Sequence, residues 1–61
     1  MKNLEEMTRK ELAEIIVDDQ IRRGIVTPDK KEMLIQARLT GIIKMSKAEL
    51  YKSAKYMLEI A

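Results

Sequence analysis

Two short stretches, MTRKEL (residues 7–12) and MSKAEL (residues 45–50), have almost the same sequence, and they decide how the chain divides into helices. In each, a hydroxyl residue (Thr8 or Ser46) stands three positions before a glutamate. This spacing is typical of a capping box, in which the hydroxyl accepts from a first-turn N–H and the glutamate accepts from the N–H of the cap residue. The repeat therefore predicts two helix starts, and capping alone is enough to explain it.

The residues around each capping box strengthen this prediction. Met7 and Leu12 flank the first box, and Met45 and Leu50 flank the second. An apolar pair at these two positions forms a hydrophobic staple, which fixes the angle at which the chain enters a helix.

The middle helix has a different start signal. In VTPDKKE (residues 26–32), Thr27 is the expected cap, and Pro28 suits the first helical position because its ring fixes a helical φ. Asp29 then faces the positive end of the helix dipole.

Two glycines are expected to end the first and second helices. Gly24 and Gly41 are each predicted to adopt the left-handed conformation that commonly follows a helix. Ile25 and Ile42 come next and are the residues expected to make the apolar contact that accompanies this ending.

These signals predict an all-α fold, because no segment has the alternating pattern of a strand. Residues 8–61 are expected to form a single three-helix domain, preceded by a short arm or turn at residues 1–7. The predicted helices span residues 9–23, 28–40 and 47–60.

The composition argues against catalysis. The 61 residues include neither cysteine nor histidine, so thiolates, the commonest metal ligand and the commonest general base are all missing. The two serines have no base available to activate them. We therefore expect no enzymatic activity, no cofactor, no bound metal and no small-molecule substrate.

Hydropathy and charge bear on location and partners. No apolar run approaches the roughly 18 residues of a membrane span, and the first ten residues lack the apolar segment of a signal peptide. We therefore expect a cytoplasmic protein with no membrane partner. The net charge is +2, but residues 1–29 hold five basic and seven acidic side chains, whereas residues 30–61 hold seven and three.

The helix predicted at residues 9–23 has more apolar surface than one core face requires. Leu12, Ile15 and Ile16 form one apolar strip, and Ala13, Val17 and Ile21 form a second strip beside it. Together the two strips span roughly 240° of the helix circumference, whereas a single core face needs only ~100°. Either this helix packs against both other helices, or the second strip is exposed and binds a protein. In the second case Glu14 and Asp18 form its charged rim.

The basic second half supports an alternative. Lys30 and Lys31 lie at the predicted start of the second helix, and Lys44 and Lys47 lie at the start of the third. Backbone N–H groups at helix starts bind phosphate, and lysines neutralise its charge. The same lysines can also simply form a solvated face.

Residues 9–39 resemble the helix–extended–helix modules known as SAP, HeH and Rho N-terminal-like domains. The resemblance covers about half of the chain and implies contact with a nucleic-acid backbone through Lys30 and Lys31. The first helix is about one turn longer than in those modules, and the third helix is additional. The matching residues are Glu11, Leu12, Gly24, Ile25, Thr27, Lys30, Lys31, Leu34 and Ile35.

Two functional hypotheses follow. The first is a small non-catalytic regulatory or inhibitory protein that binds another protein, or a second copy as a homodimer, through an apolar helical face. The alternative is a nucleic-acid-binding module that contacts phosphates through its basic helix starts.

Overall fold

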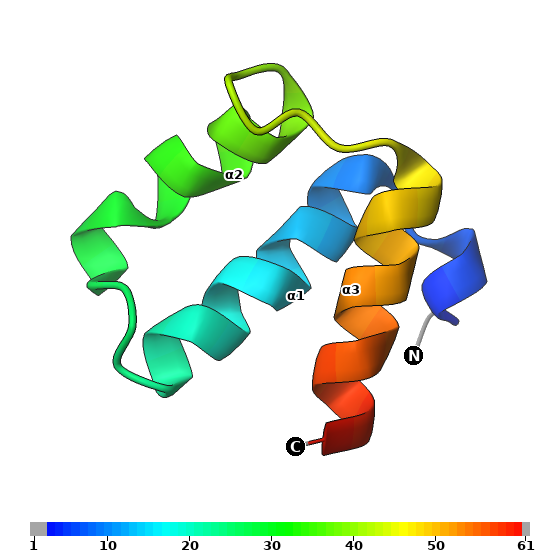
Figure 1. Ribbon diagram of the computed structural model, residues 1–61, viewed down its shortest axis with the longest axis horizontal. Helices are drawn as coiled ribbons and strands as arrows, with labels where there is room; N and C mark the ends of the chain where they lie inside the picture. Colours follow the sequence, from blue (N-terminus) through cyan, green and yellow to red (C-terminus); the bar gives the residue numbers. More distant parts are fainter. Residues whose placement is uncertain (1–2, 61) are drawn as a thin grey trace.

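Three α-helices form the structure, which is a computed structural model describing residues 3–60 (Figure 1). No strand occurs in this range, so the predicted all-α fold with three helices is confirmed. A 3₁₀ turn precedes each of the first two helices. In chain order the elements are η1 (Leu4–Glu6), α1 (Arg9–Arg22), η2 (Pro28–Lys30), α2 (Lys31–Leu39) and α3 (Lys47–Ile60).

Both predicted capping boxes are formed. The N–H of Thr8 donates to a carboxylate oxygen of Glu11 at 3.0 Å, and the N–H of Glu11 donates to the Thr8 hydroxyl at 3.2 Å. Ser46 and Glu49 repeat the same two bonds at 3.0 and 3.2 Å before α3. The bonds from the backbone and side chain of Ser46 lower the pKa of Glu49, because they favour its charged form.

The start of the second helix differs from the prediction in its first turn. Residues 28–30 form the 3₁₀ turn η2, closed by a bond from the N–H of Lys30 to the carbonyl of Thr27 at 3.1 Å. Pro28 does occupy the first position of this turn. Thr27 makes no side-chain cap bond; its side chain instead hydrogen-bonds Asp29 and thereby lowers the pKa of that carboxyl.

The end of α1 follows the prediction closely. Gly24 has a φ of +78°, in the left-handed region. Its N–H donates to the carbonyl of Ile21, and the N–H of Ile25 donates to the carbonyl of Gln20, both at 3.0 Å. These two bonds make a Schellman motif, which satisfies carbonyls at the end of the helix.

The end of α2 is different, and the prediction of a left-handed Gly41 is wrong. Among the described residues, Gly24 alone has a positive φ. Gly41 is required for space instead, because a Cβ there would lie 2.6 Å from the Cα of Ala37. The apolar contacts expected of the next residues are also weak or missing: Ile25 is 69% exposed and Ile42 is fully exposed.

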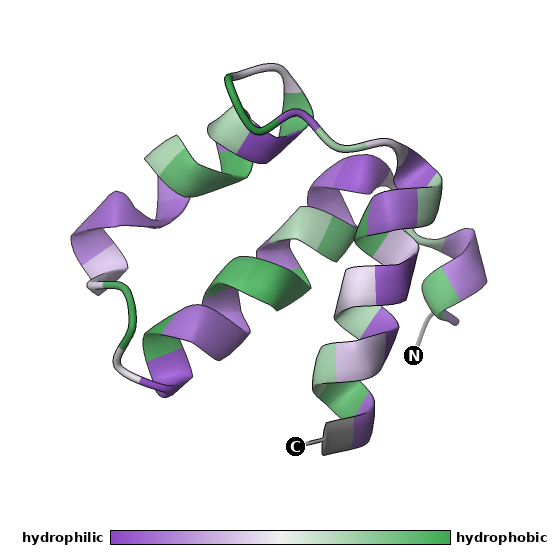
Figure 2. Ribbon diagram, viewed as in Figure 1, coloured by the Kyte–Doolittle hydropathy of each residue, from purple (hydrophilic) through white to green (hydrophobic). Residues whose placement is uncertain are grey.

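The core is built around α1, which packs against both α2 and α3 (Figure 1). Hydrophobic and hydrophilic residues alternate along each helix (Figure 2), and hydrophobic residues of all three helices form the buried core. Partly buried apolar residues, among them Leu4 and Met7, surround the core. The fully buried apolar side chains are Leu12, Ala13, Ile16, Val17, Ile35, Leu50 and Ala54.

Arg9 ties the three helices together at one end of the domain. From the first position of α1, its Nη2 donates to the carbonyl of Leu39 at 2.7 Å and to the carbonyl of Met45 at 2.8 Å. The N–H of Met45 donates in turn to the carbonyl of Arg38 at 2.8 Å. The segment that joins α2 to α3 is therefore held at both of its ends.

Removing either capping hydroxyl should destabilise the domain. We expect Thr8→Ala and Ser46→Ala each to lower the free energy of unfolding by about 1 kcal/mol, because each leaves an N-terminal N–H without its acceptor. Urea unfolding followed by circular dichroism measures this loss. Ser53→Ala is the matched control, since Ser53 lies within α3 and caps no helix; an equal loss in that variant would contradict the assignment.

Candidate functional site

The apolar strip predicted to bind a protein belongs to the core. Ala13 and Val17 are completely buried, and Ile21 is half-buried and packed against the core cluster. The expectation that this strip is exposed is therefore wrong. The physical reason is the central place of α1, which has α2 on one side and α3 on the other, so both of its apolar strips have a neighbour.

The two carboxylates predicted as the rim of that strip are paired within the chain. The ammonium of Lys31, at the first position of α2, lies 3.0 Å from a carboxylate oxygen of Asp18 and 3.6 Å from one of Glu14. The hydrogen bond to Asp18 and the charges of both carboxylates raise the pKa of Lys31. This cluster links α1 to the start of α2.

The four lysines of the alternative hypothesis do not come together. Lys30 and Lys31 lie where α2 begins, whereas Lys44 and Lys47 lie beyond its other end (Figure 1). Lys30, Lys44 and Lys47 are exposed, but Lys31 is held by its two carboxylates. The chain thus presents two separate pairs of lysines, and carboxylates partly neutralise the pair that contains Lys31.

Asp19 has a role that the sequence analysis missed. Its side chain is only 7% exposed and forms ion pairs with Arg22 and, at 2.7 Å, with Nε of Arg23. Burial alone raises the pKa of Asp19, but the hydrogen bonds and charges of the two arginines outweigh this effect, and the pKa lies below its usual value. The sequence does contain a signal for these ion pairs: Arg22 and Arg23 follow Asp19 by three and four residues, and residues at these spacings face each other on a helix.

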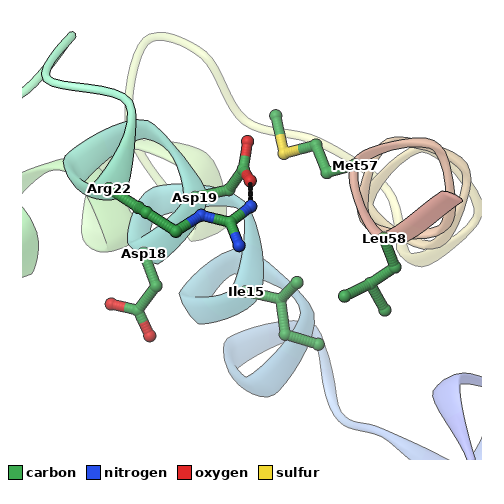
Figure 3. A pocket seen from close by; sticks show the side chains of 6 residues that line it. All are labelled: Ile15, Asp18, Asp19, Arg22, Met57 and Leu58. Atoms are coloured by element: carbon green, nitrogen blue, oxygen red, sulfur yellow. Dashed lines mark hydrogen bonds and ion pairs between the residues drawn. The ribbon is translucent and has the colours of Figure 1, made fainter. Parts of the chain in front are cut away.

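A shallow groove lies between α1 and α3 (Figure 3). We call it the α1–α3 groove; its volume is about 260 Å³. Ile15 points from α1 toward Leu58 on α3, and the Arg22 guanidinium, bonded to Asp19, lies at the other side. The lining residues are Ile15, Asp18, Asp19, Arg22, Met57 and Leu58.

A second hollow of about 240 Å³ adjoins this groove and shares Ile15 and Asp18 with it. It extends along α1 past Glu14 and Glu11 to Met7. Glu11, Glu14 and Asp18 therefore stand along this side of α1, and Lys31 pairs with the last two. The surface around Ile15 combines apolar side chains with charges of both signs, because Arg22 lines the same groove.

The segment between α2 and α3 offers a second apolar feature. We call residues 40–46 the isoleucine loop, because Ile42 at its tip is fully exposed and the neighbouring Ile43 is exposed as well. Lys44 lies within this loop and Lys47 follows it; both lysines are exposed. The loop thus combines exposed apolar side chains with basic neighbours.

Residues 3–60 contain no cluster of three or more acidic side chains placed to hold a metal ion. None of the helices in this range combines the length and apolar character that crossing a bilayer requires. The described residues present half-exposed apolar side chains beside charged groups that ion pairs hold in position, and another molecule can contact such a surface.

Placing a charge at Val17 should unfold the protein. We expect Val17→Asp to lose helical circular dichroism at 25 °C, because an unpaired buried carboxylate costs several kcal/mol and a domain of this size has only about 3–5 kcal/mol to lose. Tyr56→Asp, at a position that is 63% exposed, is the control and should stay folded. A helical Val17→Asp variant would show that Val17 is outside the core.

The Asp19 ion pairs should stabilise the fold only while the carboxyl is charged. Because its folded pKa is lowered, the stabilisation is present above the unfolded pKa of about 4 and is lost as the pH falls through the folded value. Asp19→Asn should therefore be less stable than wild type at pH 7, with the difference shrinking below pH 4. Urea unfolding at several pH values, with Glu59→Gln as a control for loss of a charge, measures this; a pH-independent difference would contradict it.

No family model, curated protein or solved structure matches this chain.

Proposed function

We propose that this chain is a small non-catalytic protein of the regulatory or inhibitory kind, and that it acts by binding another protein through the α1–α3 groove. The observation that carries the proposal is the groove itself, where apolar side chains from two helices line one hollow. This site replaces the strip at Ala13, Val17 and Ile21, whose side chains the core uses.

The groove has the make-up of a protein-binding site. Ile15 and Met57 are half-buried and Leu58 is 54% exposed, so an apolar side chain from a partner would remove the exposed part of each from water. Asp18 and Arg22 stand at its edge and add charges of both signs, which favour a partner with the complementary pattern. A centre of apolar contacts with a polar edge is the usual anatomy of such interfaces.

The supporting residues hold this site in place. Asp19 fixes Arg22 and Arg23 at the end of α1, so the charged edge of the groove has a defined geometry. Met57 packs against the buried core, which orients the neighbouring Leu58. Side chains that are ordered before binding lose less entropy when the partner docks.

A charge in the groove should abolish partner binding. We expect Leu58→Asp to lose at least tenfold in affinity, because a carboxylate would have to be buried beside the partner's apolar surface. Tyr56→Asp is the matched control, since Tyr56 is 63% exposed on the same helix and does not line the groove. Comparative affinity capture, followed by titration calorimetry with the captured protein, measures the two effects.

Three results of this experiment are informative. A protein that wild type and Tyr56→Asp retain and Leu58→Asp loses, with circular dichroism unchanged in all three, supports the proposal. Equal binding by Leu58→Asp overturns the groove as the site. Capture that disappears after nuclease treatment overturns protein binding and favours the nucleic-acid alternative at Lys30, Lys44 and Lys47.

A further inference from the structure

We propose that Met45 is a methionine-oxidation site, at which a peroxide converts the thioether to a sulfoxide and the guanidinium of Arg38 binds the new oxygen. The observation behind this inference is a hydrogen bond from Nη1 of Arg38 to the sulfur of Met45 at 3.2 Å. Neither residue lines the α1–α3 groove, so this inference and the proposed function can fail separately.

The surroundings of Met45 differ from those of the other methionines that the structure describes. Its sulfur alone among these accepts a hydrogen bond from a described residue. Met33 is 61% exposed to solvent, whereas Met7 and Met57 pack against the apolar core. Met45 is also only partly buried, so a molecule as small as hydrogen peroxide can reach its sulfur.

The guanidinium of Arg38 lacks a strong acceptor within the described part of the chain. Its Nη2 donates to the amide oxygen of Gln20 at the long distance of 3.5 Å, and its Nε is buried without a partner. None of the ion pairs formed in residues 3–60 includes Arg38. A thioether accepts hydrogen bonds only weakly. A better acceptor beside this cation would therefore be favourable.

Oxidation of Met45 supplies that acceptor. A lone pair of the sulfur attacks one oxygen of hydrogen peroxide, the O–O bond breaks, and the departing hydroxide takes up the proton of the transferred oxygen to give water. The sulfur loses two electrons and the peroxide gains them. The product is a polar sulfoxide. The unbranched side chain of Met45 has three rotatable bonds, which can make room for the added oxygen.

The position of Met45 gives this reaction a structural consequence. The N–H of Met45 donates to the carbonyl of Arg38, and the carbonyl of Met45 accepts from Arg9, both at 2.8 Å. A bond from the guanidinium of Arg38 to the sulfoxide adds a further link between the end of α2 and the residue before the cap of α3. A sulfoxide in an apolar core disrupts packing, but at Met45 it should strengthen the junction of α2 and α3.

Chemical synthesis of the full chain with methionine sulfoxide at one position tests the contact directly. With the sulfoxide at position 45, the urea midpoint of unfolding should rise above that of the unmodified protein for at least one of the two sulfoxide epimers. Sulfoxide at position 57 should lower the midpoint, because Met57 packs against the core. Sulfoxide at position 33 is the control and should leave the midpoint unchanged, because Met33 is largely exposed.

A variant without the guanidinium tests the role of Arg38. In Arg38→Gln, sulfoxide at position 45 should lower the urea midpoint instead of raising it, because the added oxygen then has no cation beside it. Lys52→Gln is the matched control: it removes an exposed positive charge from α3 and should keep the rise. Nuclear magnetic resonance needs no variant, since the guanidinium protons of Arg38 should exchange with water more slowly once the sulfoxide is present.

Peroxide treatment of the folded wild type tests whether Met45 is reached. Mass spectrometry of the peptides should show oxidation at Met33 first and then at Met45, with helical circular dichroism retained. If Met45 stays unmodified until the protein unfolds, it is not an oxidation site. If both epimers at position 45 lower the midpoint as sulfoxide at position 57 does, or if the exchange of the Arg38 protons is unchanged, the contact with Arg38 is overturned.

Discussion

The interaction on which the architecture depends is the hydrogen bonding of Arg9. One guanidinium nitrogen joins the start of α1 to the carbonyl that ends α2 and to a carbonyl just before α3. Carbonyls at the end of a helix have no partner within it, so a cation there is favourable on electrostatic as well as geometric grounds. A single side chain thereby brings three helix termini together, while Lys31 ties the start of α2 to Asp18 and Glu14 on α1.

The central position of α1 explains where binding surface is available. With α2 and α3 on either side, α1 uses both of its apolar strips in the core, and Ala13 and Val17 have no exposed area. Exposed apolar groups remain outside the core, among them Leu58 beside Ile15 in the α1–α3 groove and Ile42 in the isoleucine loop. In this small domain, apolar surface that could bind a partner therefore lies outside the central helix packing, in the α1–α3 groove and in the isoleucine loop.

Local signals in the sequence were sufficient for the helices, and long-range packing was not readable from it. Thr8 with Glu11 and Ser46 with Glu49 predict helix starts because a capping box involves residues three apart. The wide apolar span of α1 left two alternatives open, burial against both other helices or an exposed strip, and only the packing of α2 and α3 decides that Val17 is buried. The position of the groove has the same origin, since Ile15 and Leu58 are far apart in the sequence. The pairing of Asp19 with Arg22 and Arg23 was within reach of local reasoning, because residues three and four apart face each other on a helix.

The two glycines are needed for different reasons: Gly24 for its left-handed backbone torsion angle, and Gly41 because there is no space for a side chain. At Gly24 the backbone is left-handed and nothing lies within 4 Å of the place where a Cβ would be. A D-amino acid favours that mirror-image region, and a chain of 61 residues is within reach of chemical synthesis. D-Alanine at position 24 would therefore favour the left-handed turn, whereas at position 41 even one methyl group of the natural hand would strike the helix behind it.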